Sequence, residues 1–456
     1  MKTKLIALVA AMSAIAAAAA DFNNAWIKGE TDKGMVEYKV GDEMTLTLTP
    51  QGVKGEIAAG EYLLALNRSG DDGVSEGKYL PFDGKPIVYR TKFGAPGFLR
   101  VFARVVEAET KKDVLKKFTG DASTPEGKRA MNQFERQPKQ VFFDGGAGAE
   151  IEKLANREEP KDFDEFWRGQ FARLDKIPLK SEMVEMKSPN PKVNFYAVTV
   201  QCAGLRPVTG YLTVPKDVAS GRRYPCKLST RGYDGDKFDQ DVPGWAPMDC
   251  IWFYINAHGL RLPEFGGTEA DRKALRWEAR SHDFTYAFDP QQNADPETAY
   301  FNGMVLRVKR ALQFLKAQKG WNGKDLWAEG GSQGGLQTIW AAACGEGVTK
   351  AFSCVTWGCD LGGELTFARN RGGWYLHWAD GLGYYDAVNW AKRIPKSCFT
   401  EITRAGLGDY TCPPSGLAAL WNALKCPKKV TWVQGSQHGY VPPDYPGRDA
   451  VYESAK

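Results

Sequence analysis

A glycine-rich turn around one serine constrains the fold of this chain more than any other feature. The sequence from Asp325 to Gln337 reads DLWAEGGSQGGLQ, a short apolar run, then the glycine-rich turn, then a helix-like run. G-x-S-x-G between a strand and a helix is a sharp turn that forces its serine into strained geometry. Gly330 and Gly334 are expected to let strand and helix approach closely. Ser332 then stands exposed beside the first helical amides, where negative charge is stabilised.

The motif by itself is common, and many glycine-rich loops only connect elements. The strand–turn–helix context is what favours a catalytic interpretation, because that context is the one in which the motif exposes a nucleophile. The turn therefore predicts that Ser332 is a nucleophile.

Length and composition exclude several classes of protein. The 456 residues suffice for one large domain with a small one, or for two to three domains. The 43% hydrophobic and 25% charged content is typical of soluble globular proteins. The net charge is +5, or +3 without Lys2 and Lys4. So small a basic excess gives no support for nucleic-acid binding.

The first twenty residues, MKTKLIALVAAMSAIAAAAA, combine a short basic region, an apolar run and small residues near the end. This pattern predicts a signal peptide over residues 1–20, with cleavage between Ala20 and Asp21. The mature protein is then secreted or periplasmic. No later stretch is long and apolar enough to span a bilayer, so no membrane association is expected after cleavage.

Cysteine and histidine usage gives little support to metal chemistry. The nine cysteines all follow residue 201, their number is odd, and no CxxC pair occurs. An oxidising compartment would allow one or two disulfides, whose pairing the sequence does not reveal. The four histidines form no HExxH motif and no tight ligand cluster. Neither a metal nor another cofactor is expected.

Residues 21–150 read as all-β. Short β-rich runs are separated by Gly, Asp and Pro: Met44–Thr49, Tyr62–Leu66, Pro86–Thr91 and Gly97–Val105. This spacing predicts a small all-β immunoglobulin-like sandwich. The charged run Glu107–Lys117 is expected to be a solvated helix or loop, and the Gly/Ala-rich run Gly145–Ala149 to begin a linker. A packing or spacer role is favoured over carbohydrate binding for this part.

Residues 151–456 alternate between strand-like and helix-like runs. An amphipathic helix is predicted to begin after Asp162, and another over Met304–Gln318 with Arg307 and Arg310 facing away from its apolar side. Strands are predicted at residues 195–215 (two strands), 224–230, 251–257, the run before Ser332, 351–358, 398–404 and 429–434. A further helix is predicted at residues 416–424, before the last of these strands. The alternation predicts an α/β-hydrolase fold, a mostly parallel sheet with helices on both faces and catalytic groups at the strands' carboxyl ends.

A serine nucleophile needs a base, and the base needs an orienting acid. In this fold the chain order is serine, then acid, then histidine. His438 follows the last predicted strand and is preferred over His377, which lies in an aromatic-rich stretch and is expected to be packed structure. Asp409 follows the strand before it and is preferred over Asp360, the runner-up.

Backbone amides are expected to form the oxyanion hole. One amide belongs to the residue after the nucleophile, Gln333. The other should come from the loop after an earlier strand, where the sequence reads RGYDGD, and Tyr233 is the predicted donor. A plain glycine-rich turn is the alternative interpretation of this loop.

The stretches PKDFDEFW, GYLTVP, STRGYDG, GGSQGG, GLGDYTCPPS and QGSQHGY occur in order from about Pro160 to Tyr440. In combination they resemble the acetyl xylan esterase / cephalosporin-C deacetylase family, carbohydrate esterase family 7. The resemblance implies a triad of Ser332, Asp409 and His438, with the amides of Tyr233 and Gln333 as oxyanion hole. It also implies a serine carboxylesterase that removes O-acetyl groups from carbohydrates, and a homo-oligomer that the extra β part would modify.

Two departures from the family pattern stand near the predicted site. The family usually has Arg-Gly-Gln where this chain has His258, Gly259 and Leu260, and His-Glu where it has His438 and Gly439. Neither removes a triad member, and both indicate a divergent branch. A peptidase or other acyl hydrolase of the same fold therefore remains an alternative, as does a non-catalytic carbohydrate-binding protein on a hydrolase scaffold.

Overall fold

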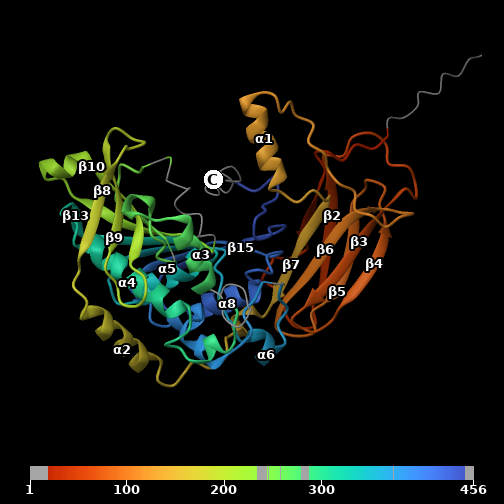
Figure 1. Ribbon diagram of the computed structural model, residues 1–456. Coiled ribbons are helices and arrows are strands. Elements are labelled where there is room, and N and C mark those ends of the chain that lie inside the picture. Colours follow the sequence, from red (N-terminus) through yellow and green to blue (C-terminus); the bar gives the residue numbers. More distant parts are fainter. Residues whose placement is uncertain are drawn as a thin grey trace, which may run out of the picture.

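The computed structural model describes residues 19–233, 244, 246–256, 258–278, 287–372 and 374–446. The predicted signal peptide lies almost entirely outside these residues and stays a prediction. Among the described residues, no helix is both long and apolar enough to cross a membrane. Figure 1 shows two parts side by side, an all-β part from the first third of the chain and a part with a central sheet and helices.

The all-β part, called here the N-terminal sandwich, consists of two antiparallel sheets. Its strands within the described residues are β1 (Trp26–Thr31), β2 (Glu43–Gln51), β3 (Tyr62–Gly70), β4 (Glu76–Pro81), β5 (Ile87–Lys92), β6 (Gly97–Glu107) and β7 (Phe142–Ala149). One sheet has the order β1-β2-β5 and the other β4-β3-β6-β7. Met44, Leu46 and Leu48 alternate along β2 and are at most 1% exposed, so one face of that strand enters the core between the sheets. The expected immunoglobulin-like sandwich is present, with β4 paired to β3 rather than to β5.

One local expectation for this part is wrong and another is confirmed. Gly145–Ala149 is not a linker but the end of β7, buried along its whole length. The charged run after Glu107 is a loop held to β6 by a bridge between Val106 and Asp113. A helix that the sequence did not suggest, α1 (Pro125–Glu135), has no buried residue and so offers no apolar period to read.

The second part is built on one nine-stranded mixed sheet. Its strands are β8 (Ser181–Met186), β9 (Val193–Val200), β10 (Val208–Pro215), β11 (Tyr224–Thr230), β12 (Ile251–Ile255), β13 (Trp321–Gly331), β14 (Lys350–Cys354), β15 (Phe399–Gly406) and β16 (Lys428–Val433). Their order is β16-β15-β14-β13-β11-β12-β10-β9-β8. The run from β16 to β12 is parallel, and β10, β9 and β8 continue it antiparallel. The carboxyl ends of six neighbouring strands therefore meet at one edge of the sheet.

The helices of this part are α2 (Phe163–Asp175), α3 (Glu269–Glu278), α4 (Phe301–Lys316), α5 (Gln333–Ala343), α6 (Gly363–Phe367), α7 (Ala387–Ala391) and α8 (Pro414–Ala423). Short 3-10 turns complete it: η1 (Ile151–Lys153), η2 (Lys216–Ser220), η4 (Pro263–Phe265), η5 (Gln292–Ala294) and η6 (Asp380–Tyr384). Leucines and aromatic residues of α4, α5 and α8 share one core with the strands. This mixed sheet with its helices is the α/β-hydrolase arrangement that the alternating runs predict.

Helix α4 differs from the expectation in one respect. Arg307 and Arg310, predicted to face away from the core, are only 5% and 3% exposed. The Arg310 guanidinium donates to the carbonyls of Leu174 and Ile177, at 2.6 and 2.9 Å. These carbonyls lie at the end of α2, which covers the polar side of α4. Arg310 thus satisfies a helix terminus rather than facing water.

Candidate active site

Ser332 occupies the turn between β13 and α5 in a strained conformation. Its backbone has φ 57° and ψ −121°, a region that residues with a Cβ rarely adopt. The Ser332 amide donates to the Cys354 carbonyl at 2.9 Å, and the Trp357 amide donates to the Ser332 carbonyl at 3.1 Å. The neighbouring strand and the loop after it therefore hold the serine at the carboxyl edge of the sheet.

The glycines on either side of Ser332 are required by contact, as predicted. A Cβ at Gly330 would lie 2.4 Å from Thr230 Oγ1 and 2.5 Å from the Gly334 carbonyl oxygen. A Cβ at Gly334 would lie 2.4 Å from the Thr230 carbonyl oxygen. Real Cβ atoms do not come so close, so any larger residue at either position would force β11, β13 and α5 apart.

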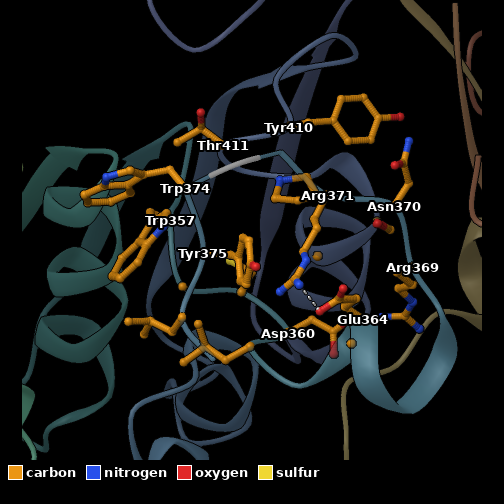
Figure 2. A pocket seen from close by; sticks show the side chains of 18 residues that line it. Trp357, Asp360, Glu364, Arg369, Asn370, Arg371, Trp374, Tyr375, Tyr410 and Thr411 are labelled. Carbon is orange, nitrogen blue, oxygen red and sulfur yellow. Dashed lines mark hydrogen bonds and ion pairs between the residues drawn. The ribbon is translucent and has the colours of Figure 1, made fainter. Parts of the chain in front are cut away.

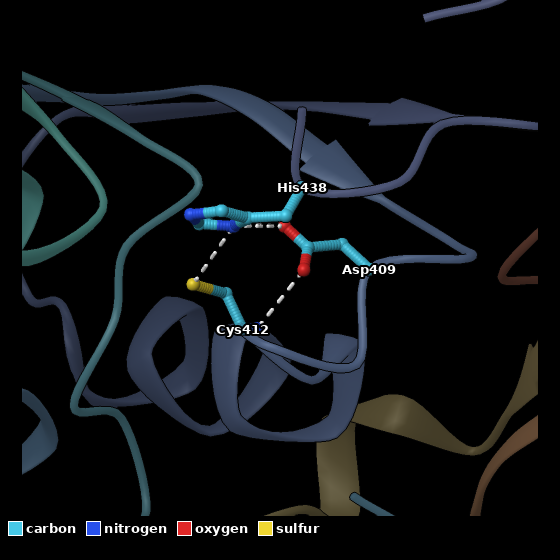
Figure 3. Close-up of side chains that lie close together, drawn as sticks. All are labelled: Asp409, Cys412 and His438. Atoms are coloured by element: carbon cyan, nitrogen blue, oxygen red, sulfur yellow. Dashed lines mark hydrogen bonds and ion pairs between the residues drawn. The ribbon is translucent and has the colours of Figure 1, made fainter. Parts of the chain in front are cut away.

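Asp409 and His438 come together at the same edge of the sheet (Figure 3). Asp409 follows β15, His438 follows β16, and His438 Nδ1 lies 3.0 Å from Asp409 Oδ2. The aspartate is fully buried, and its other oxygen accepts from the amides of Thr411 and Cys412 at 3.1 and 3.0 Å. Because the carboxylate only accepts, the ring proton is on Nδ1 and Nε2 is left as the acceptor.

The two alternative residues have other surroundings. Asp360 is ion-paired with Arg369, and burial raises the pKa of its carboxyl from 3.8 to about 7. It is therefore engaged as a structural acid rather than with His438. His377 is exposed, with its ring against Tyr375, so the expectation of a packed histidine is wrong. Its exclusion as the base stays a prediction.

The loop predicted to carry the second oxyanion donor lies directly beside the serine. A Cβ built on Gly232 would be 4.0 Å from the Ser332 Cβ and 3.4 Å from the Gly331 carbonyl oxygen. Tyr233 follows, 47% exposed, and the remainder of the predicted RGYDGD turn lies outside the described residues. Gln333 is the first residue of α5, so its amide is at a helix N-terminus.

His258 contributes to this loop in a way that the sequence did not reveal. The side chain is 2% exposed, and its Nε2 lies 3.0 Å from the carbonyl oxygen of Tyr233. Its Nδ1 lies 3.0 Å from the Tyr300 hydroxyl. A carbonyl only accepts, so Nε2 carries the proton and Nδ1 accepts from the hydroxyl. In the sequence His258 stands out only as a departure from the family pattern. Its position just after β12, at the carboxyl edge of the sheet, was the signal that could have placed it near the site.

The oxygen, sulfur and nitrogen atoms of Asp409, Cys412 and His438 lie within 4.8 Å of one another, a spacing that could hold a metal ion. The chemistry of these donors fits poorly. His438 Nδ1 and Asp409 already form a hydrogen bond, and burial raises the pKa of the Cys412 thiol well above its usual value, so the sulfur stays protonated. The cluster is better described as an acid–base pair with a thiol packed beside it. All nine cysteines of the chain are free thiols, and the disulfides that the sequence allowed are not formed.

A pocket with aromatic walls adjoins these residues, and sequence reasoning missed it because its walls come from distant loops. The empty space in it is about 560 Å³, a figure that includes open solvent at its mouth. Figure 2 shows Trp357 and Trp374 on one side and Arg369 and Asn370 on the other. The Trp374 ring packs against Tyr233 of the oxyanion loop, with centroids 4.9 Å apart, and Tyr410 directly follows Asp409. The pocket therefore reaches both the serine side and the acid side of the site.

Comparison with known proteins identifies the family of this chain. The family model for acetyl xylan esterase (AXE1) matches residues 150–371 and 377–453. Acetyl esterase Axe7A of Xylanibacter ruminicola is 26% identical over 293 residues, 61% of this chain and 63% of that relative, so the match leaves over a third of the relative unmatched.

Among solved structures, an acetyl xylan esterase from Paenibacillus sp. R4 superposes with a TM-score of 0.53 at 22% identity, over 67% of this chain and 98% of that one. Acetyl xylan esterase 1 from a Thermoanaerobacterium species gives 0.49 at 19% identity, over 67% and 98%. The similarity to the first of these structures establishes the fold, and the match to the family model establishes family membership. The chain belongs to the acetyl xylan esterase (AXE1) family, as a divergent homologue with an N-terminal sandwich ahead of the family region.

Proposed function

We propose that this protein is a serine carboxylesterase that removes O-acetyl groups from carbohydrates through an acetyl-enzyme intermediate. The observation that carries the proposal is the 3.0 Å hydrogen bond between His438 Nδ1 and Asp409, at the same sheet edge as the strained Ser332. Membership of an esterase family supports the ester bond as the target. This arrangement of acid, base and strained serine is what acyl transfer requires.

In the proposed acylation step, His438 Nε2 takes the Ser332 hydroxyl proton as the oxygen attacks the acetyl carbonyl carbon. Asp409 stabilises the imidazolium and keeps the ring in the tautomer that leaves Nε2 as the acceptor. His438 then gives the proton to the departing sugar oxygen. In the second half, His438 takes a proton from water as the water oxygen attacks the acetyl carbon. His438 then gives that proton to Ser332 Oγ as the acyl–oxygen bond breaks, which releases acetate and restores the serine.

The charge that develops on the carbonyl oxygen is assigned to the amides of Gln333 and Tyr233. Gln333 begins α5, where the helix favours negative charge. The Tyr233 loop runs close to the serine, since a Cβ added at Gly232 would lie 4.0 Å from the Ser332 Cβ. Losing one such donor typically costs on the order of 2.7–4 kcal/mol of transition-state stabilisation.

The aromatic pocket is proposed to bind the sugar that leaves. Its tryptophan faces suit the apolar face of a sugar ring, and its charged and amide side chains suit the hydroxyl groups. Trp374 touches Tyr233 and Tyr410 adjoins Asp409, so a sugar held there would lie beside the loops that carry the proposed oxyanion donor and the acid.

The experiment is release of acetate from a panel of acetylated polysaccharides, aryl acetates and peptide anilides, comparing wild type with Ser332→Ala. We expect acetate release from acetylated carbohydrates, reduced by more than about 10³-fold in the variant. Faster cleavage of peptide anilides would favour a peptidase. If folded wild-type protein neither released acetate nor reacted with a fluorophosphonate, the proposal would fail and the carbohydrate-binding alternative would replace it.

A further inference from the structure

The N-terminal sandwich touches the two loops that carry Asp409 and His438. Strand β7 lies on the side of the sandwich that faces the mixed sheet (Figure 1). The Gly408 backbone packs against it: a Cβ at Gly408 would lie 2.2 Å from the Asp144 carbonyl oxygen. The Arg100 guanidinium lies over the Tyr410 ring, 4.6 Å from its centre. Both neighbours of Asp409 in the chain therefore contact the sandwich.

The loop before His438 is held by the same strand. The Gly146 amide donates to Gln434 Oε1 at 2.9 Å, and Gln434 Nε2 donates to the Gly146 carbonyl at 2.8 Å. A Cβ at Gly145 would lie 2.1 Å from Gln434 Oε1. Contact with the histidine loop thus explains Gly145, where any side chain would collide with Gln434.

A buried carboxylate connects the two loops. Asp144 is fully buried and receives Arg100 Nε and Nη2 at 2.7 and 2.6 Å. Its Oδ2 also accepts from Gln437 Nε2 at 2.7 Å, and Gln437 directly precedes His438. Burial raises the pKa of the Asp144 carboxyl, while the hydrogen bonds from Arg100 act in the opposite direction.

We propose that Asp144 and Gln437 are positioning residues for His438. The N-terminal sandwich then holds the loops of Asp409 and His438 in fixed positions relative to each other. This inference rests on the proposed function. The separation between Asp409 and His438 depends on two loops from different strands. The sandwich forms hydrogen bonds with the His438 loop and packs against the backbone of the Asp409 loop. It therefore fixes the position of the two loops relative to each other. Positioning of this kind matters because a displacement of 1 Å can cost about 10²-fold in rate.

The test is Gln437→Met, which keeps the length of the side chain and removes the amide. We expect kcat on an aryl acetate to fall by about ten- to hundred-fold with KM nearly unchanged. The matched control is Ser69→Ala, which removes a hydrogen bond between the same two parts, from Asn370 Nδ2 at 2.8 Å, away from His438. Its kcat should stay within about two-fold of wild type, since a displacement of the histidine is what affects the rate.

A spectroscopic reading separates this inference from the proposed function. With ¹⁵N-labelled histidine only four residues contribute, and His438→Gln identifies the signal of the Nδ1 proton shared with Asp409. That signal should shift or broaden in Gln437→Met and not in Ser69→Ala.

An unchanged signal and unchanged kcat in folded Gln437→Met would overturn the positioning role, as would equal losses of kcat in both variants. Gln437→Asn, which keeps the amide but shortens its reach, replaces Gln437→Met if that variant does not fold. A wild type with the signal but no esterase activity would instead count against the proposed function alone.

Discussion

At the scale of single residues, the chemistry of the site depends on backbone contacts more than on the side chains themselves. Ser332, Asp409 and His438 are ordinary residue types that become a candidate triad through their positions at strand ends. Ser332 has a positive φ, and Gly330 and Gly334 beside it leave no room for a Cβ. His258 fills the place of the family's arginine and holds the Tyr233 carbonyl. The departure from the family pattern thus supplies a new support for the same loop.

His258→Phe should lower kcat by about ten- to hundred-fold with little change in KM, less than the loss of an oxyanion donor itself. The ring keeps its bulk but loses the donor that fixes the Tyr233 carbonyl, so the neighbouring amide is displaced. Steady-state kinetics on an aryl acetate measures this, with exposed His377→Gln as the neutral control. An unchanged kcat in folded His258→Phe would show that the Tyr233 loop needs no such support.

At the scale of elements, the carbonyl groups at the end of α2 explain why Arg310 of α4 is buried. Sequence periodicity places Arg310 on the outer face of α4, which is correct for an isolated amphipathic helix. In the protein α2 lies across that face, and its last carbonyls need donors. The guanidinium provides them while buried, and so the arginine acts as a cap for another helix.

Arg310→Met should lower the free energy of unfolding by about 1.5–3 kcal/mol, because hydrogen bonds from a charged donor are lost and two carbonyls lose their partner. Lys429→Met, whose 62% exposed side chain pairs with Glu401, should cost less, about 0–1 kcal/mol. Urea unfolding of both variants provides the comparison. Equal costs would mean that the buried guanidinium contributes no more than a surface charge.

At the scale of the whole molecule, the two parts share an apolar cluster as well as the polar contacts of β7. Phe98 and Leu407, from β6 and from the loop before Asp409, are each at most 2% exposed and lie in one cluster with Leu154 and Ala418. The Phe98 ring is 5.3 Å from that of Trp432 on β16. Such a contact couples the unfolding of both parts.

Wild type should therefore unfold in a single calorimetric transition, and Phe98→Ala should separate it into two. The substitution removes about 3–5 kcal/mol of packing from the shared cluster. Phe82→Ala, the same change inside the sandwich's own core, should lower the midpoint without removing the contacts of Phe98. Two transitions already present in wild type, or a single one in Phe98→Ala, would contradict this account.

The sequence by itself predicted most of the elements and the candidate site. Periodicity placed most strands and the helices that bury an apolar face, and the glycine-rich serine turn with the order Ser332, Asp409, His438 located the candidate site. These signals are local, because strand alternation, helix period and turn chemistry are set by neighbouring residues.

Only the tertiary structure decided what depends on contacts between distant segments. Gly145–Ala149 looks like a linker because it contains only glycine and alanine. It is the end of a strand, and the missing side chain at Gly145 makes room for Gln434. Arg310 looks solvated because nothing in its own helix shows that α2 will cover it. The hydrogen bonds from His258 to Tyr233 and from Gln437 to Asp144 join residues 25 and 293 positions apart. Their partners are chosen by the packing of whole elements, which no local pattern encodes.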